Sequence, residues 1–492
     1  MSEIKLKPHQ VDHFARVMDI MNKNRAYVDT SATGAGKTYI AVKIAQVMNL
    51  KVLVVSPKSL TTKWKVVTEE YGVELVDTIT YGLLRGTKNK CNHPWLTRSN
   101  DQFYPTREFQ DLVRSGVLVV FDEIGHIKNK KAMQTKAAHA LARASGHMAL
   151  ISAMPLDNID NIECIFKMLG IVTHEGLHFY EREGHKFGTG EYVMTGFDEV
   201  KSKCLKWDPD TTKKILAPDG IEIPITRRNI NTLAFKLYTN VVKYHISSSA
   251  APFKIDAIQD IGNGFYKMDP NQEKLWKQEI SKLKKAIGYD ETTKTATKSG
   301  FNSTTAILHT LETIKVDIIV REAEKVLTSN PNAKVIVVMF YLDPMNSVAK
   351  KLAKYSPLIM SGALSTRNRN TIMDKFQKAT SESRLLITQI ITGGEGIDLD
   401  DNHGDYPRFS FIAPTYHFQA LHQATGRTYR ESTKSKATIR IMYGQNTSEN
   451  AADLEAKMLT AMARKSQIAK DMLANPDSNR LPFPDEYKSY FE

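Results

Sequence analysis

The run S-A-T-G-A-G-K-T at residues 31–38 constrains the fold of this chain more than any other feature of its sequence. An apolar segment, residues 26–28, leads into the run, and a helix-like segment, residues 39–48, follows it. A strand, a glycine-rich loop and a helix in this order place backbone N–H groups and a helix N-terminus around a phosphate. The run therefore predicts a phosphate-binding loop in an α/β domain.

Each residue type in the loop has a definite task in this chemistry. Gly34 and Gly36 permit the backbone angles that turn successive N–H groups toward the phosphates. Lys37 is expected to reach the β- and γ-phosphate oxygens, and the Thr38 hydroxyl to bind Mg²⁺. Ser31 departs from the full G-x-x-x-x-G-K-[ST] pattern, which has glycine at that place.

Composition sets wider limits. With 492 residues the chain is too long for a single core, so two or more domains are expected. Its formal net charge of +13 favours a polyanionic partner, most often nucleic acid, although a lysine-rich solvated surface gives the same charge. Three distant cysteines predict neither a disulfide framework nor a zinc site. The sequence shows no signal region and no membrane-spanning apolar stretch, so we expect an intracellular, soluble protein that does not bind membranes.

An adjacent acid pair, Asp122 and Glu123, is the second chemical landmark. It follows the apolar run V-L-V-V-F at residues 117–121, which is typical of a buried parallel strand. Such a strand delivers its last residues to the carboxyl edge of the sheet, where ligands bind. Downstream of a phosphate loop, Asp122 is expected to hold Mg²⁺ and Glu123 to polarise the attacking water as general base.

Other polar residues are expected at the same edge. Lys58 and Ser59 follow one apolar run, and Ser152 and Ala153 follow another. The second pair is expected to touch the acid pair and to relay the state of the nucleotide. Gln10, at the head of a helix before the phosphate loop, has the donor and the acceptor needed to read adenine.

The second half of the chain repeats the alternation of strands and helices. Its strands are expected at residues 334–340, 358–362, 385–391 and 409–413. Two doubly wound α/β domains follow from this pattern. In a helix after the last strand, Arg427 and Arg430 are three residues apart and share a face. This spacing suits two arginine fingers that reach the γ-phosphate across an interdomain cleft, whereas the helix taken alone favours a salt-bridged basic surface.

Two patterns resemble metal sites and are interpreted otherwise. H-E-G-L-H at residues 174–178 matches the H-E-x-x-H pattern of zinc proteases, with His185 as a conceivable third ligand. Gly176 weakens the helix that must carry both histidines, so a polar insertion is the better interpretation. Cys91 and His93 lack a second ligand pair nearby and are interpreted as structural or incidental.

Taken in order, these segments resemble the motifs of the superfamily 2 helicases and translocases, and most of all their Snf-type, chromatin-remodeller-like branch. The resemblance covers roughly residues 5–170 and 334–432. Motifs Q, I, Ia, Ib and II correspond to L-K-P-H-Q, S-A-T-G-A-G-K-T, S-P-K-S-L-T-T-K-W, I-T-Y-G-L-L-R and F-D-E-I-G-H-I-K-N. Motifs III, IV, V and VI correspond to S-A-M-P-L-D-N, M-S-G-A-L-S-T-R-N-R-N-T-I-M-D-K-F, T-G-G-E-G-I-D-L and Q-A-T-G-R-T-Y-R. The family form of motif I does not require the first glycine, so Ser31 is no objection.

The resemblance implies a role for each motif residue. Residues implied to hold ATP are Gln10, Thr33, Gly34, Ala35, Gly36, Lys37, Thr38, Gly396 and Asp398. Residues implied to act in catalysis are Lys37, Asp122, Glu123, Arg427 and Arg430, with Mg²⁺ at Thr38 and Asp122. Residues implied to contact nucleic acid are Lys58, Ser59, Tyr81, Gly82, Thr392 and Gly393. Residues implied to couple hydrolysis to movement are Ser152, Ala153 and Gln423.

One departure from the family concerns this coupling. The family usually reads D-E-A-H, and alignment on Lys128-Asn129 puts Gly125 in the histidine place and His126 one residue later. In the family that histidine links ATP hydrolysis to motif III and to the second domain. The resemblance therefore leaves coupling open in this chain, with His126 as a substitute if the backbone bends at Gly125.

The resemblance also implies the architecture: two tandem RecA-like domains, each with a doubly wound parallel sheet, and an ATP cleft between them. We expect the first domain at residues 1–230, with a polar insertion at about 171–220. A linker is expected at residues 231–270, the second domain at 271–470 and a C-terminal tail at 471–492.

The sequence thus predicts an ATP hydrolase that acts on duplex or branched DNA as a translocase or helicase, in remodelling, branch migration or unwinding. An RNA-directed or single-strand-tracking helicase is the alternative. A non-catalytic nucleic-acid-binding protein with a helicase fold predicts damage to Lys37, Glu123 or Arg427, and all three are intact. The compact chain resembles viral or phage members that act in recombination, replication or transcription, and a monomer is expected.

Overall fold

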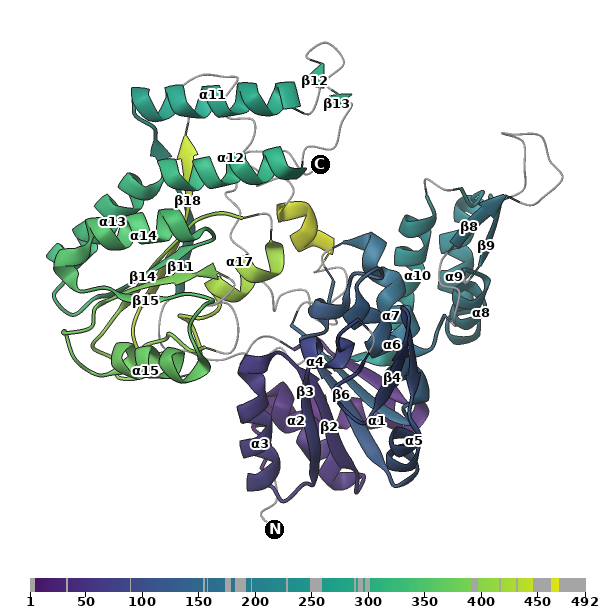
Figure 1. Cartoon of the computed structure of the whole chain (residues 1–492). Helices are drawn as coiled ribbons and strands as arrows, with labels where there is room; N and C mark the ends of the chain where they lie inside the picture. The colour runs from purple at the N-terminus through teal and green to yellow at the C-terminus, as the bar shows by residue number, and fades with distance from the viewer. Residues whose placement is uncertain are drawn as a thin grey trace. The chain divides into compact units, whose positions relative to one another are not determined.

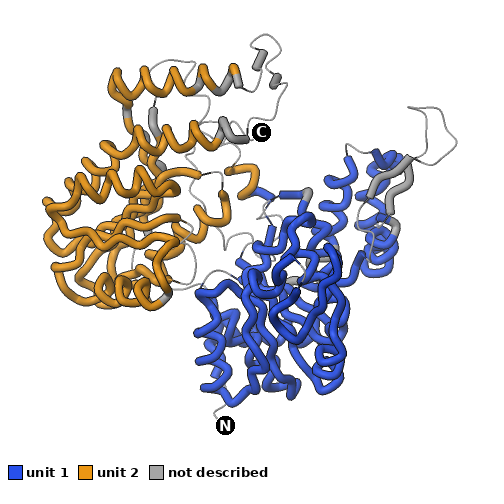
Figure 2. The backbone as a smooth tube through the Cα atoms, viewed as in Figure 1, with its two compact units in different colours: residues 1–252, 467–479 blue, residues 253–466, 480–492 orange. Residues whose placement is uncertain are grey.

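The chain folds into two compact units, each built on its own parallel sheet (Figures 1 and 2). The first unit comprises Met1–Pro252 and Gln467–Asn479, and the second Phe253–Ser466 and Arg480–Glu492. The computed structural model describes residues 5–31, 34–88, 90–153, 155–156, 158–172, 178–181, 192–195, 197–226, 229–247, 259–286, 289–290, 295–296, 301–390, 397–415, 417–430, 432–445 and 462–468.

A six-stranded parallel sheet with the order β10-β1-β7-β6-β2-β3 forms the centre of the first unit. Its strands are β1 (Ala26–Asp29), β2 (Lys51–Ser56), β3 (Leu75–Thr80), β6 (Val117–Asp122), β7 (His147–Ile151) and β10 (Ile246–Ser247). Every residue of β1 and β6 is buried, as in strands covered on both faces. Because β7 lies between β1 and β6, the phosphate loop and the acid pair leave the sheet close to one another.

Helices cover both faces of this sheet. One face carries α1 (Pro8–Lys23), α2 (Lys37–Val47) and α3 (Thr61–Glu70), and the other carries α4 (Tyr81–Arg85), α6 (Met133–Ala144), α7 (Ile162–Leu169) and α10 (Ile230–His245). Along β6, Leu118 and Val120 belong to the first core, whereas Val119 and Phe121 belong to the second. This division follows from the pleat, which points successive side chains to opposite faces.

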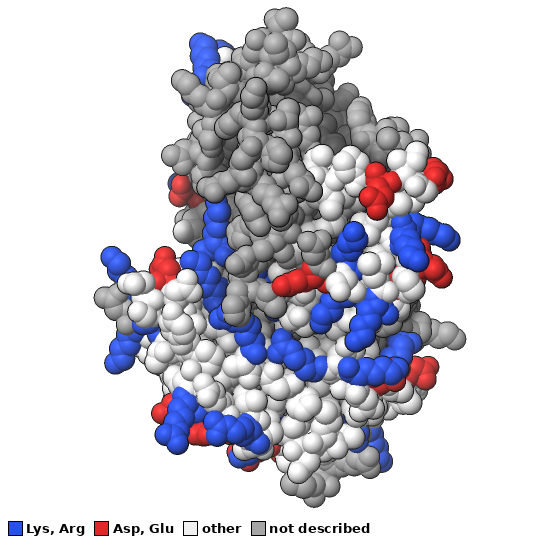
Figure 3. Space-filling view, turned by 90° about the vertical axis from the view of Figure 1, so that its right-hand side faces the viewer, with Lys and Arg blue, Asp and Glu red and all other residues white. Residues whose placement is uncertain are grey.

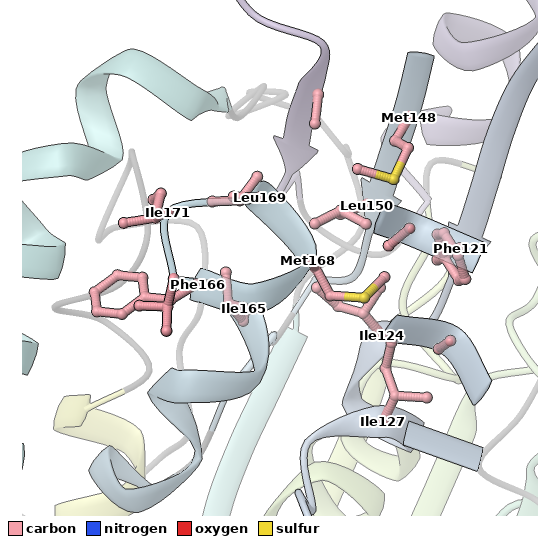
Figure 4. Close-up of a cluster of buried hydrophobic side chains, with 14 of the residues drawn as sticks. Phe121, Ile124, Ile127, Met148, Leu150, Ile165, Phe166, Met168, Leu169 and Ile171 are labelled. Carbon is pink, nitrogen blue, oxygen red and sulfur yellow. The ribbon is translucent and has the colours of Figure 1, made fainter. Parts of the chain in front are cut away.

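The second core also anchors the turn that follows the acid pair (Figure 4). In the 3-10 turn η2 (Ile124–Ile127), the side chains of Ile124 and Ile127 are buried in one cluster with Met168 of α7 and Leu150 of β7. The chain is therefore held immediately after Glu123 by packing rather than left as a free loop.

Further elements of the first unit are η1 (Lys58–Leu60), the antiparallel hairpins β4 (Leu96–Ser99) with β5 (Gln102–Pro105) and β8 (His178–Glu181) with β9 (Tyr192–Thr195), α5 (Arg107–Arg114), η3 (Ile159–Asn161), α8 (Phe197–Trp207), α9 (Pro209–Leu216) and η4 (Pro218–Gly220). Much of the expected polar insertion is thus regular structure. Phe197, Val200 and Cys204 of α8 are buried in the first unit's core. The mean polarity of the segment concealed this apolar face.

The second unit repeats the plan with a six-stranded parallel sheet in the order β11-β18-β17-β14-β16-β15. Its strands are β11 (Gln259–Lys267), β14 (Lys334–Met339), β15 (Leu358–Met360), β16 (Leu385–Gln389), β17 (Arg408–Ile412) and β18 (Ala437–Gln445). The four apolar runs that predicted strands in this half of the chain correspond to β14, β15, β16 and β17.

Helices of the second unit are α11 (Pro270–Ala286), α12 (Phe301–Ile314), α13 (Val316–Ser329), α14 (Leu342–Lys351), α15 (Thr366–Gln377) and α17 (Phe418–Thr425), with η5 (Ala353–Tyr355) and the small hairpin β12 (Tyr289–Asp290) with β13 (Thr295–Ala296). Residues 462–468 are also helical. α13 and α14 share one core with the sheet. α11 and α12 enclose a smaller one around Trp276.

The unit boundaries differ from the expected ones in two places. Two described parts of the expected linker at residues 231–270 are regular structure: Leu233 and Leu237 of α10 are buried in the second core, and β11 pairs along its whole length with β18. Ile468, expected in the second domain, belongs to the second core of the first unit. Sequence composition does not reveal which of two cores an apolar residue joins. Within the described residues, no helix has both the length and the apolarity that a membrane crossing requires.

Candidate nucleotide site

Three neighbouring strands end at the same level and build the site. In the pairing register Ile151, the last residue of β7, lies opposite Asp29 of β1 on one side and Asp122 of β6 on the other. Adjacent strands are spaced about 4.8 Å apart, so the backbones at the two aspartates are about 10 Å apart. Ser152 continues β7 between them, and its N–H donates to the Asp29 carbonyl at 3.1 Å. The topology thus joins segments that are distant in the sequence.

The phosphate loop has the backbone that its glycines predict. Gly34 and Gly36 have φ angles of 89° and 88°, in the left-handed region that favours glycine. A Cβ atom at Gly36 would also collide with the side-chain amide of Gln10. α2 begins directly afterwards, at Lys37, so its N-terminal N–H groups face the loop.

Gln10 contacts the loop itself. Its Nε2 donates to the Ala35 carbonyl at 3.0 Å, and its Oε1 accepts from the Lys7 N–H at 2.9 Å. The side chain is buried. The structure therefore places Gln10 as a contact of the phosphate loop, while the reading of adenine stays a prediction.

Lys37 lies among acidic groups. Its Nζ donates to the Ser31 carbonyl at 2.7 Å. Burial lowers the pKa of Lys37, and the nearby carboxylates of Asp29, Glu123 and Asp122 oppose that shift. A cation held beside three acids at the mouth of a phosphate loop suits a polyanionic ligand that carries its own metal ion.

Asp122 is oriented by a residue that the sequence interpretation did not assign. The indole Nε1 of Trp64, fully buried on α3, donates to Asp122 Oδ2 at 2.8 Å. Burial, together with the charge of Glu123, raises the pKa of Asp122 to about 6. Trp64 occupies one carboxylate oxygen, and Asp122 Oδ1 is the oxygen that can face a cation. The signal for this role was present in the motif S-P-K-S-L-T-T-K-W, whose tryptophan lies on the apolar face of α3.

Glu123 turns the chain out of the sheet. Its backbone is left-handed, with φ 55° and ψ 58°, which is uncommon for a residue with a side chain. The Ser152 hydroxyl donates to Glu123 Oε2 at 3.3 Å. Ser152 therefore contacts the acid pair, as the sequence predicted, and Ala153 beside it is buried. Their coupling role stays a prediction.

The expected nucleic-acid contacts separate into exposed and buried residues. Lys58, Ser59 and Gly82 are exposed at the carboxyl ends of β2 and β3. The Tyr81 side chain is buried, and its hydroxyl donates to the Asp122 carbonyl at 2.8 Å. The expectation that Tyr81 contacts nucleic acid is therefore corrected, because its ring packs inward behind the acid pair.

His126 stacks on that ring. The ring centroids of Tyr81 and His126 are 5.4 Å apart, with an interplanar angle of 19°. Gly125 is buried within η2. His126, which follows Gly125 at the position where the family has histidine, is thus linked through Tyr81 to the backbone of Asp122. Sequence alone does not show this link, because residues 81 and 126 lie on separate elements.

Arg427 and Arg430 are not on a helix. α17 ends at Thr425 with Gly426 as its C-cap, and both arginines lie in the turn that follows. Arg427 Nη1 donates to the Ile397 carbonyl at 3.0 Å, and Arg430 Nε donates to Asp398 Oδ1 at 3.1 Å. The expectation of two fingers projecting from one helical face is wrong, because glycine ends the helix and the second unit's own loop takes up the guanidinium groups.

A third buried arginine, Arg408 of β17, also contacts this loop. It donates to the carbonyls of Leu399, Tyr406 and Asp400 and to the Gln377 side chain, at 2.8 to 3.1 Å. Burial lowers the pKa of Arg408 to about 10. Sequence analysis missed this residue because it reads as the start of an apolar strand.

Several candidate residues need a separate note. Thr33, Thr392, Gly393 and Gly396 lie outside the described residues, and Gln423 lies half-buried on α17.

His178 lies on β8, a strand, which rules out the helix that H-E-x-x-H requires. His93 accepts from the Trp95 N–H and bonds to the Leu84 carbonyl, so both of its ring nitrogens face backbone groups. Among the described residues no cluster of three or more His, Cys, Asp or Glu side chains is placed to hold a metal ion.

Two α/β units with parallel sheets, one of them with a phosphate loop beside an acid pair, are typical of proteins that bind nucleoside triphosphates. Family comparison agrees with this class. The family model described as "Type III restriction enzyme, res subunit" matches residues 3–148, and the model "Helicase conserved C-terminal domain" matches residues 315–432. The chain belongs to the superfamily 2 helicases, which are ATP-dependent.

Individual relatives differ in their coverage. "Putative ATP-dependent RNA helicase L364" of Acanthamoeba polyphaga mimivirus is 25% identical over 468 residues, which make up 90% of this chain and 80% of that protein. "DNA repair and recombination protein RAD54-like" of Drosophila ananassae is 26% identical over 164 residues, or 32% of this chain and 19% of that protein. The solved structure "Sulfolobus solfataricus SWI2/SNF2 ATPase core in complex with dsDNA" aligns with 96% of this chain and 98% of that chain, at 15% identity and a TM-score of 0.34.

Proposed function

We propose that this helicase is a nucleic-acid-stimulated ATPase that translocates on duplex or branched DNA. The observation that carries the ATPase part is the convergence of Lys37, Asp122 and Glu123 at the carboxyl edge of the first sheet. The choice of DNA is supported by the Snf-type motifs and by the RAD54-like relatives.

The residues present fit a magnesium nucleotide. The N–H groups around Gly34 and Gly36 and the ammonium of Lys37 are suited to the phosphates. Thr38 and Asp122 offer a hydroxyl and a carboxylate oxygen, which are the hard ligands that Mg²⁺ prefers. Two protein ligands are enough, because nucleotide-bound Mg²⁺ takes its other ligands from phosphates and water. When bound, the ion neutralises charge that develops on the phosphate oxygens.

The protein groups then divide the work of hydrolysis. Glu123 is the general base that orients and polarises the attacking water. Ser152, which donates to Glu123 and is joined by its N–H to Asp29, holds that base in relation to the phosphate loop. Lys37 stabilises the charge on the transferred phosphoryl group. Arg427 and Arg430 remain candidates for the same task, and each must first leave its contact at Ile397 or Asp398.

Nucleic acid is proposed to bind beside this edge. Lys58, Ser59 and Gly82 are exposed there. On the face drawn in Figure 3, Lys and Arg side chains predominate over Asp and Glu, in line with the net charge of +13. Contacts of this kind go to backbone phosphates, so binding is expected to depend on salt and little on sequence. Thr392 and Gly393 are proposed to contribute from the second unit.

A second candidate, an RNA-directed helicase, is favoured by one specific observation. The mimivirus relative, whose name refers to RNA, matches this chain over 90% of its length, whereas the RAD54-like match covers 32%. The two candidates share the ATPase chemistry and differ in the nucleic acid that stimulates it.

The test is the steady-state ATPase rate without nucleic acid and with single-stranded, duplex and branched DNA and RNA. Duplex or branched DNA is expected to raise the rate about tenfold or more, since nucleic acid completes the active state. Glu123→Gln is expected to abolish hydrolysis but to retain nucleotide binding, because it removes the base and keeps the shape of the side chain. Stimulation by RNA alone would select the second candidate. No stimulation by any nucleic acid would contradict both.

A further inference from the structure

We propose that α1 braces the phosphate loop at both of its ends, and that His13 is a positioning residue that keeps Lys37 available for phosphate by occupying Asp29. This inference rests on the proposed ATPase function and deepens it. It concerns two residues, His13 and Asp29, that no sequence motif singled out. It also gives a physical reason for serine at position 31.

Two residues of α1 reach the loop. Gln10 and His13 are three positions apart and therefore share a helix face. Gln10 donates to the Ala35 carbonyl, next to Gly36, at the end of the loop where α2 begins. His13 Nε2 lies 3.1 Å from Asp29 Oδ2, at the end where β1 ends. One helix thus contacts the chain on both sides of Gly34.

Asp29 uses both of its carboxylate oxygens. Oδ2 contacts His13, and Oδ1 accepts from the Ser31 N–H at 2.9 Å. Both His13 and Asp29 are almost completely buried, at 1% and 0% exposure. Although burial raises the pKa of Asp29, His13 and Lys37 outweigh it and hold that pKa below its ordinary value. An ionised carboxylate only accepts, so His13 Nε2 carries the hydrogen in this pair.

Ser31 is the member that links this pair to Lys37. Its N–H donates to Asp29, its hydroxyl lies 3.4 Å from His13 Nε2, and its carbonyl accepts from Lys37 Nζ at 2.7 Å. Glycine, which the full phosphate-loop pattern has at this place, would keep the two backbone contacts but lose the hydroxyl. The serine therefore gives the loop a third point of attachment to α1.

The arrangement matters for nucleotide because Asp29 is one of the acidic groups that can compete with the phosphates for Lys37. Asp29 is close enough to influence the charge state of Lys37. While His13 pairs with Asp29, Lys37 Nζ donates to the neutral Ser31 carbonyl. Without His13, Asp29 is a buried carboxylate lacking its main partner, and Lys37 is the nearby cation that can neutralise it. Asp29 would then compete with the phosphates for Lys37.

Because of this competition, binding measurements can distinguish a positioning role of His13 from a role in packing alone. His13→Ala is expected to weaken Mg-ADP binding about tenfold, measured by calorimetry on the full chain. His13→Gln restores an N–H donor near the place of Nε2 and is expected to recover most of the affinity. The double variant His13→Ala/Asp29→Asn removes the competing charge but keeps an oxygen for the Ser31 N–H, so it should also recover affinity. A purely structural role of His13 predicts no such rescue.

Val17→Ala is the matched control. Val17 is a fully buried residue of the same helix that packs in the core on that side of the sheet. Its truncation is expected to lower the thermal stability while the Mg-ADP affinity stays within about twofold, because α1 keeps both contacts to the loop. If Val17→Ala weakens binding as much as His13→Ala does, or if the double variant shows no recovery, the proposal is wrong.

Amide hydrogen exchange of the nucleotide-free protein gives a second readout. Faster exchange at residues 31–38 in His13→Ala, but not in His13→Gln, is expected if α1 braces the loop. Unchanged exchange together with unchanged affinity would overturn the proposal. If the wild-type chain binds no Mg-ADP, the proposed ATPase function fails, and the exchange measurement still decides whether His13 holds the loop.

Discussion

At the scale of single residues, the acid pair is held by side chains from other elements. Trp64 fixes one oxygen of Asp122, and Ser152 contacts Glu123. Tyr81 supports the Asp122 carbonyl from behind. The acids themselves could be predicted from the sequence, because an apolar run followed by D-E is a local pattern. Their supports could not, since each comes from another element and meets the acids only in the folded sheet.

Trp64→Phe tests whether this support matters for the metal. The change keeps most of the ring packing but removes the N–H that donates to Asp122 Oδ2. The Mg²⁺ concentration needed for half-maximal ATPase activity is expected to rise about tenfold, as is common when a partner of a metal ligand is lost. Trp95→Phe is the matched control, because the Trp95 indole also faces an aspartate, Asp77, at 3.4 Å. An equal shift in both variants would contradict the role of Trp64.

At the scale of elements, the strands were predictable and the ends of helices were less so. The runs that became β6, β7, β14 and β16 are mostly apolar, and burial on both faces of a sheet leaves few alternatives for them. The helix expected to carry Arg427 and Arg430 ended before them, at Thr425. A single glycine in a helical pattern is tolerated in many contexts, and here the contacts of the following turn decided against continuation.

Arg408 is expected to hold the turn segments of the second unit together. Arg408→Met removes donors to three carbonyls and one amide while it keeps much of the volume. We expect a loss of about 3 kcal/mol in the free energy of unfolding of the second unit, measured by urea denaturation, because buried acceptors are left unpaired. Arg440→Met, which breaks a partly exposed pair with Asp260, is expected to cost less than about 1 kcal/mol. If Arg408→Met and Arg440→Met lower the free energy of unfolding by similar amounts, the buried contacts of Arg408 contribute no more than a partly exposed ion pair.

Glu312 makes the stability of the second unit depend on pH. This buried residue of α12 accepts from the N–H groups of Phe340 and Tyr341, at the carboxyl end of β14. Burial raises the pKa of Glu312 from 4.5 to about 7. Between these values the folded protein holds a proton that the unfolded chain has lost, so the free energy of unfolding falls as the pH rises through this window.

Glu312→Gln should remove that dependence, because glutamine keeps the acceptor and does not ionise. Relative to the wild type, the variant is expected to gain up to about 3 kcal/mol between pH 5 and pH 8, measured by urea denaturation. Glu324→Gln, which alters a surface carboxylate paired with Lys354, serves as the control and should show no such trend. If the free energy of unfolding of Glu312→Gln differs from that of the wild type by the same amount at every pH, the pH dependence does not come from Glu312.

At the scale of the whole molecule, two parallel sheets carry different parts of the proposed machinery. The first unit holds the phosphate loop, the acid pair and exposed residues proposed to meet nucleic acid, and the second holds the arginines with their own loop. The approximate number of units followed from chain length and from two series of strands. The boundaries did not, because α10, β11 and Ile468 join their cores through contacts between distant parts of the chain.

The net charge leads to a prediction for the whole chain. If phosphate contacts dominate, the logarithm of nucleic-acid affinity falls linearly with the logarithm of salt concentration. Lys58→Ala is expected to make that slope shallower by about one and to weaken all sequences equally, since one phosphate contact is lost. Lys23→Ala, at an exposed residue paired with Asp19, should leave the slope unchanged. Fluorescence anisotropy with labelled duplex at several salt concentrations measures both, and equal slopes in all three proteins would exclude Lys58 as a contact.

The sequence by itself determined the chemistry that is encoded locally: the phosphate loop, the acid pair, the apolar strands and the class of motor that they indicate. Such patterns depend on neighbours in the chain, so they are readable without a fold. The tertiary structure decided which residues support that chemistry. His13 meets Asp29, Trp64 meets Asp122 and Arg408 meets residues 399–400 because parallel strands bring distant segments to one edge. Burial makes an unpartnered polar group costly, which favours these contacts.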